Sequence, residues 1–263
     1  MTVTERFAAL VRGPEECLPL DEAALLLAAH AEPDLDVSGQ LHRLDELAAR
    51  CPEPSVHGVR ALLFDDLGLR GNTIDYSDPR NSFLDQVLDR GLGIPISLSV
   101  ITIEVGRRLG VPFEGVGMPG HFLVRHAGDP PVLLDPFHGG VEVTADRCES
   151  LFETLFGPDV PFSPSLLAAT GRRHILARML ANLKNSYRER SDAAALAWVA
   201  RLRAFIPGVP HTELADLARQ LVNLGQLDQA ADALDELASS VSLTKDEAHQ
   251  VRSRASQLRA RLN

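Results

Sequence analysis

Two residues near the middle of the chain, His121 and Asp135, have the types and the spacing of a catalytic pair. His121 opens one predicted strand and Asp135 ends the next, with the turn-forming stretch AGDPP between them. In an antiparallel hairpin whose turn is centred near residue 128, the first residue of one strand faces the last residue of the other. Both residues are odd-numbered, so they also share one face of the pleat with Leu123 and Leu133. We therefore expect the two side chains to meet.

Such a pair would suit a general base. A carboxylate beside an imidazole fixes its tautomer and stabilises its cationic form, which leaves the other ring nitrogen free to activate a nucleophile. The expected place for the nucleophile is the start of the next helix upstream, where unpaired N–H groups and the helix dipole stabilise a thiolate. The sequence at that helix start, Gly-Ile-Pro-Ile-Ser over 93–97, contains no cysteine. Ser97 is the nearest hydroxyl in the first turn.

Three interpretations of this region are open. Ser97 can simply bond a backbone N–H in the first turn of the helix. It can also be a substitute nucleophile in a hydrolase or amide-modifying acyltransferase with His121 and Asp135, although a serine needs an efficient base and an oxyanion hole. Finally, His121, Asp135 and His138 could bind a metal ion, but their spacing matches no known zinc motif. The first interpretation is favoured, and we expect neither a metal nor a cofactor.

The three cysteines, Cys17, Cys51 and Cys148, all lie outside the helix start. A sparse, odd number of cysteines disfavours a disulfide framework and favours a reducing compartment. Cys148 follows the last predicted strand, where ordinary burial explains it.

Composition excludes several function classes. The 263 residues carry a formal net charge of −10, which disfavours general nucleic-acid binding because Lys and Arg supply most of that affinity. There is no apolar run of about 20 residues that could span a membrane. The N-terminus lacks the cationic start and apolar run of a signal peptide. These features predict a cytoplasmic protein that binds neither nucleic acid nor membranes.

The elements that must position the pair change in type along the chain. Helical patterns cover 4–13, 20–30 and two further segments that end at Pro52 and before Gly71. Asn81 is the expected N-cap of the next helix, and Pro95 suits the first turn of the one after it, which ends at Gly110. Short strands are then predicted over 111–118, 121–126, 131–137 and 140–145. Helices followed by an antiparallel sheet indicate an α+β domain.

After about residue 160 only helical patterns are found. One helical pair is predicted over 162–192 and 193–208, a second over 212–228 and 229–241, and a closing helix over 244–263. A repeated helix–turn–helix unit of about 34 residues with small residues at the packing face is the tetratricopeptide pattern. Such repeats form concave surfaces that bind peptides or proteins, so we expect a protein or peptide partner at these helices.

Several segments resemble a known family. NSFLDQVLDRGLGIPISLSVITIEVGRRLGVPFEGVGMPGHFLVRH, the later LLDPF and the downstream NLKNSY are similar to the bacterial transglutaminase-like proteins usually called the Sir B family, over roughly residues 20 to 240. The resemblance implies an α+β transglutaminase-like (papain-like) domain over 1–155, followed by an all-α tetratricopeptide-like domain over 160–263.

The resemblance also implies which catalytic residues of the superfamily are present in this chain and which is missing. The superfamily uses a Cys–His–Asp triad, in which His121 matches the histidine and Asp135 the aspartate. The cysteine falls on Pro95 or beside it, with Ser97 the nearest polar residue. The leading hypothesis is therefore a transglutaminase-like protein without the usual cysteine that works as a non-catalytic binding or regulatory module. The alternative is an enzyme that uses Ser97, His121 and Asp135.

Overall fold

The computed structural model describes residues 1–210, 212–239 and 243–261 and separates the chain into two compact units. One unit is Glu15–Met179, and the other combines Met1–Pro14 with Leu180–Asn263. The boundaries expected from the sequence, 1–155 and 160–263, stay a prediction.

The Glu15–Met179 unit begins with helices, as the hydrophobic periodicity predicts. Its main helices are α2 (Leu20–Ala31), α3 (Val37–Ala49), α4 (Val56–Arg60), α5 (Leu84–Arg90), α6 (Pro95–Arg108) and α7 (Ala145–Phe156). Pro95 is the first residue of α6, as expected, and every residue from Pro95 to Gly106 is buried. This matches a helix that is apolar on more than one side.

The five-stranded sheet of this unit is antiparallel throughout. Its five strands are arranged in the order β6-β5-β4-β3-β7. Their bounds are β3 Phe113–Val116, β4 Leu123–His126, β5 Val132–Asp135, β6 Val141–Val143 and β7 Ala169–Thr170. The predicted α+β class with an antiparallel sheet is confirmed.

Two short pairings were not expected from the sequence. Residues 169–170 were predicted as helix, but they form β7, which pairs with Gly115 and Val116 of β3. In addition, β1 (Arg70–Gly71) and β2 (Leu92–Gly93) form a two-residue parallel pair. A two-residue strand has no periodicity of its own, so only its tertiary partner determines it.

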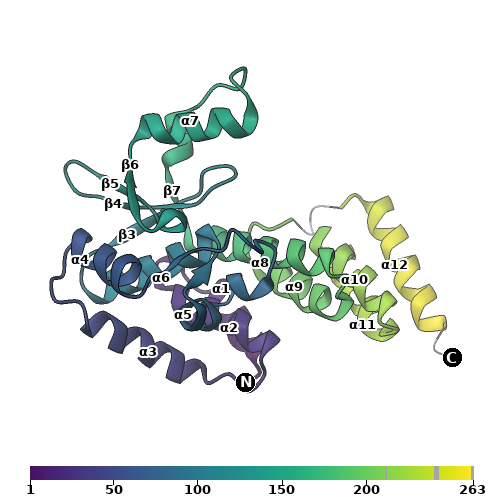
Figure 1. Cartoon of the computed structure of the whole chain (residues 1–263). Helices are drawn as coiled ribbons and strands as arrows, with labels where there is room; N and C mark the ends of the chain where they lie inside the picture. Colours follow the sequence, from purple (N-terminus) through teal and green to yellow (C-terminus); the bar gives the residue numbers. More distant parts are fainter. Residues whose placement is uncertain (211, 240–242, 262–263) are drawn as a thin grey trace. The chain divides into compact units, whose positions relative to one another are not determined.

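Helices cover both faces of the five-stranded sheet. Cys148 of α7 packs in one apolar cluster with Val116 and Leu123. On α6, a side chain at Gly106 would collide with the ring of Phe113. Phe113 and Val116 are three residues apart on β3 and point to opposite faces, so α6 and α7 cover opposite sides of the sheet, as Figure 1 shows.

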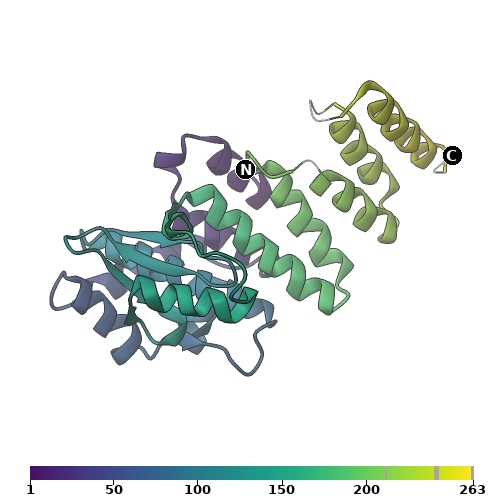
Figure 2. The same ribbon diagram turned by 90° about the horizontal axis from the view of Figure 1, so that it is seen from above.

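The other unit is helical in its described residues. It contains α1 (Val3–Arg12), α9 (Ala193–Phe205), α10 (Thr212–Asn223), α11 (Leu227–Ala238) and α12 (Lys245–Ala260), and α8 (Arg172–Glu189) crosses the boundary between the units. Each helix from α9 to α12 packs on the next one along the chain, as the green-to-yellow helices of Figure 2 show. Residues 240–241 and 262–263 of the predicted helices lie outside the described residues. Within the described part, no helix is long and apolar enough to cross a membrane.

Candidate functional site

A tight turn presents His121 just before β4. The backbone N–H of His121 donates to the carbonyl of Met118 at 3.0 Å, and Gly120 has a φ of +75°. Proline followed by glycine is the pair that a type II turn prefers, because its third residue needs a positive φ. Arg178 holds the other side of this turn by donating to the His121 carbonyl at 3.1 Å. The backbone around the imidazole is therefore well fixed.

The predicted contact between His121 and Asp135 is present. His121 Nε2 lies 2.8 Å from Asp135 Oδ2, and the two side chains are 12% and 3% exposed. The register differs from the expected one by two residues: Val124 pairs with Leu134, which places Asp135 opposite Leu123 rather than opposite His121. A shift of two residues preserves the face of the sheet, whereas a shift of one would have separated the pair.

Asp135 is the centre of the site. One of its oxygens, Oδ1, accepts the backbone N–H groups of Phe137 and His138 at 3.1 and 3.3 Å, which starts the short 3₁₀ helix Pro136–His138. The other oxygen, Oδ2, faces both His121 Nε2 and His138 Nδ1 at 2.8 Å. Burial raises the pKa of this carboxyl, but hydrogen bonds and positive charge from the two histidines outweigh it, so the pKa is lowered overall. Asp135 is thus an anion at neutral pH.

His138 also belongs to the site, where only the metal-ion interpretation of the sequence had placed it. Its side chain is 58% exposed, yet Nδ1 points at the buried carboxylate. A signal was present in the segment LDPFHGG: an aspartate that caps a short turn brings the third residue after it back toward its own side chain.

Ser97 is held by the backbone at the start of α6. Its hydroxyl donates to the Asn81 carbonyl at 2.5 Å and accepts the Ile94 N–H at 3.1 Å, and the residue is fully buried. Among the hydrogen bonds of these described residues, none joins Ser97 to His121. The hydroxyl therefore uses both its donor and its acceptor in hydrogen bonds to the backbone. This matches the first-turn interpretation and counts against Ser97 as a nucleophile.

Asn81 has a different role from the one expected. Phe83, not Asn81, stands at the N-cap of α5. The buried side chain of Asn81 instead accepts from Asn72 and donates to the carbonyls of Asp75 and Tyr76. A surface loop over 72–78 demands partners for its inward-facing carbonyls, and this requirement outweighs the capping preference.

An aromatic wall lines one side of the histidines. The Phe137 ring lies edge-on to His121, with 6.4 Å between centroids, and Tyr76 lies 6.1 Å from Phe137. Ser97 anchors Asn81, and Asn81 anchors the loop that carries Tyr76. The start of α6 thus supports the wall of the site rather than supplying a reacting group.

No cysteine stands at the start of α6. Cys17 lies in the 3₁₀ turn Glu15–Cys17, and Cys51 follows α3. Cys148 is buried beneath the sheet; burial, and secondarily the negative charge of Asp135, raises the pKa of its thiol. A buried thiol of raised pKa is a poor nucleophile.

Comparison with known proteins agrees with this fold. A family model described as the transglutaminase-like superfamily matches residues 27–181. A UPF0162 protein of Xylella fastidiosa (strain 9a5c) is 39% identical over 235 residues, which cover 84% of this chain and 83% of the relative. A UPF0162 protein of Vibrio cholerae is 33% identical over 153 residues, 57% of this chain and 56% of the relative. F-box only protein 21 of mouse is 34% identical over 134 residues, 48% of this chain and 20% of that protein.

The matched region contains both candidate residues, His121 and Asp135, and the helix start that lacks cysteine. Since the family model covers more than half of the chain, and the Xylella relative matches over most of both lengths, the chain belongs to the transglutaminase-like superfamily, together with the UPF0162 proteins.

Proposed function

We propose that this protein is a transglutaminase-like binding or regulatory module of the Sir B type that performs no thiol-dependent acyl transfer. The observation that carries the proposal is the start of α6. The first turn offers proline and serine in place of cysteine, and the Ser97 hydroxyl is fully used by Asn81 and Ile94. His121 and Asp135 then form a pair without a nucleophile to activate.

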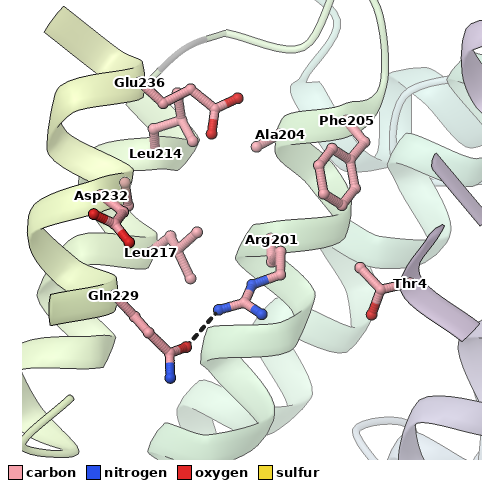
Figure 3. A pocket seen from close by; sticks show the side chains of 10 residues that line it. Thr4, Arg201, Ala204, Phe205, Leu214, Leu217, Gln229, Asp232 and Glu236 are labelled. Atoms are coloured by element: carbon pink, nitrogen blue, oxygen red, sulfur yellow. Dashed lines mark hydrogen bonds between the residues drawn. The ribbon is translucent and has the colours of Figure 1, made fainter. Parts of the chain in front are cut away.

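The helices α9 to α12 support a binding role. They pack in sequence through small residues such as Ala200, Ala218 and Ala230, which favours a tetratricopeptide-like arrangement. A cavity of about 370 Å³ opens between α1, α9, α10 and α11 (Figure 3). Phe205, Leu214 and Leu217 give it apolar lining.

The residues at the rim of this cavity, which we call the groove, indicate what it binds. Figure 3 shows Arg201 joined to Gln229, with a hydrogen bond of 2.9 Å, while Asp232 and the exposed Glu236 stand on α11. Arg259 already pairs with Asp232 at 2.7 Å. Glu236 is the carboxylate best placed to meet a cation, so we expect a cytoplasmic protein or peptide segment with apolar side chains and one Lys or Arg.

The absence of thiol chemistry is tested with the purified protein. Amine incorporation and amide hydrolysis are measured before and after alkylation with iodoacetamide. We expect no activity that alkylation removes. Activity that disappears on alkylation would show that one of the three cysteines does reach the site.

The groove is tested by selecting random peptides on the full chain. We expect the selected peptides to combine apolar and basic residues and to lose at least about tenfold in affinity for Glu236→Lys, since like charges repel across an interface. Glu189→Lys makes the same substitution at an exposed residue in the last turn of α8 that does not line the groove, and is the control. Equal loss in both variants would mean that net charge, not the groove, determines binding.

A further inference from the structure

A second histidine on the Asp135 carboxylate is more than a proton-transfer pair needs. Asp135 Oδ2 lies 2.8 Å from both His121 Nε2 and His138 Nδ1. The three ligand atoms all lie within 4.8 Å of one another. We propose that His121, Asp135 and His138 form a binding site for a divalent first-row transition metal ion, with Zn²⁺ the preferred probe. This inference goes beyond the proposed binding function and does not depend on the groove.

The donor set suits such an ion. Two imidazole nitrogens and one carboxylate oxygen are the three-ligand combination of zinc sites that keep an open coordination position. The same ligands would bind Ca²⁺ or Mg²⁺ only weakly, because those ions prefer oxygen ligands. With Asp135 ionised and both rings neutral, the site carries one negative charge. A bound divalent ion would therefore retain a net positive charge toward the open position.

The carboxylate is oriented before any ion arrives. The backbone N–H groups of Phe137 and His138 occupy Oδ1, so Oδ2 is turned toward the two rings. The His121 main chain is held on both sides, by its own N–H to Met118 and by Arg178. Hydrogen bonds that orient ligands in this way strengthen metal sites.

Metal binding requires the two imidazole rings to move relative to Asp135 and to each other. Zn–N and Zn–O bonds of about 2.0–2.2 Å in tetrahedral geometry separate the ligand atoms by about 3.3 Å. The present separations from Oδ2 are 2.8 Å, and the two ring nitrogens lie within 4.8 Å of each other. Each nitrogen must therefore move away from Oδ2 by about half an ångström, and the two nitrogens must settle about 3.3 Å apart. Each ring must also lose the proton that it shares with the carboxylate. His138 is exposed and lies at the end of a short turn, which gives it room to move and gives the ion a path from solvent.

Metal binding would exclude use of the pair as a base. An ion on His121 Nε2 replaces the hydrogen bond to Asp135 that a triad requires. The open position would instead take water or an anionic oxygen, such as a carboxylate. The site would then recognise an acidic group without a nucleophile from the protein.

The test is a titration of the metal-free full-length chain with Zn²⁺ against a competing chelator, together with Co²⁺ absorption. We expect one ion per chain. Affinity should fall by more than about 100-fold in His138→Ala and in His121→Ala, because even outer-shell changes cost about 10–100-fold. The matched control is His126→Ala, which removes a histidine of β4 whose Nδ1 bonds the Pro112 carbonyl instead.

His138→Ala should stay folded because that side chain is largely exposed, and circular dichroism checks this. Equal Zn²⁺ affinity in His138→Ala and the parent chain would overturn the proposal. Absence of stoichiometric binding would do so as well. A thiolate-to-cobalt charge-transfer band would also overturn it, because it would place the ion on the exposed Cys17 or on Cys51.

Discussion

Replacing Ser97 by alanine separates a structural serine from a catalytic one. The substitution removes a donor to the Asn81 carbonyl at 2.5 Å and an acceptor for the Ile94 N–H at 3.1 Å. Those two backbone groups also bond each other at 3.3 Å, so neither is left without a partner. The cost should therefore be about 1–2 kcal/mol, below the penalty for a fully orphaned buried group.

For a domain of this size, about 1 kcal/mol shifts the melting temperature by roughly 2–4 °C. Ser97→Ala should thus melt about 2–8 °C below the parent chain, as followed by circular dichroism. Ser99→Ala is the matched control, because Ser99 is equally buried but its hydroxyl has no hydrogen-bond partner. Removing that hydroxyl should be neutral or slightly stabilising.

Two outcomes would contradict a structural role for the Ser97 hydroxyl. If Ser97→Ala melts at the same temperature as Ser99→Ala, the hydroxyl does not anchor the helix start. If the parent chain hydrolyses amides and Ser97→Ala loses that turnover while its melting temperature is unchanged, Ser97 is a nucleophile after all.

Three further predictions concern the same unit. Gly71→Ala should destabilise the fold by about 1–3 kcal/mol in urea unfolding, because its Cβ would lie 2.4 Å from the Phe137 ring; an unchanged midpoint would contradict this. Burial raises the pKa of the Asp21 carboxyl, but the hydrogen bond from Arg108 and the other favourable contacts outweigh burial, so the pKa is lowered overall. The ionised form of Asp21 therefore stabilises the fold above about pH 4, and this contribution is lost as pH falls through the lowered pKa. Asp21→Asn should be less stable than the parent chain at pH 7 and should lose less stability when the pH is lowered. Melting temperatures measured from pH 7 to pH 3 check this. Cys148 should be alkylated only after unfolding, because it is fully buried; rapid labelling of the native chain, read by mass spectrometry, would show the opposite.

Local patterns were sufficient for most of the helices and for the pairing of His121 with Asp135. The period of α6 and the proline at its start predict a buried helix with the observed bounds to within a residue or two. Residues of equal parity on adjacent strands share a face for any even shift of register. The contact between His121 and Asp135 was therefore predicted correctly although the expected register was wrong by two residues. The lack of cysteine at the helix start is likewise a fact of sequence alone.

Tertiary structure decided what those residues contact. Ser97 could cap its helix or face the imidazole, and only the position of the Asn81 carbonyl decides this. The side chain of Asn81 serves the loop over 72–78 because that loop must satisfy its buried carbonyls. The two-residue strand β7 exists only because β3 lies beside it.

The contact of His138 with Asp135 also depends partly on local sequence and partly on tertiary structure. The residues Asp135, His138 and the two glycines after it make a tight turn foreseeable. Whether the turned-back imidazole meets the oxygen that already faces His121 depends on the register of β4 with β5 and on the turn before β4. Sequence periodicity determines which face a side chain occupies, but the distances that make three ligands a site arise from packing between strands far apart in the chain.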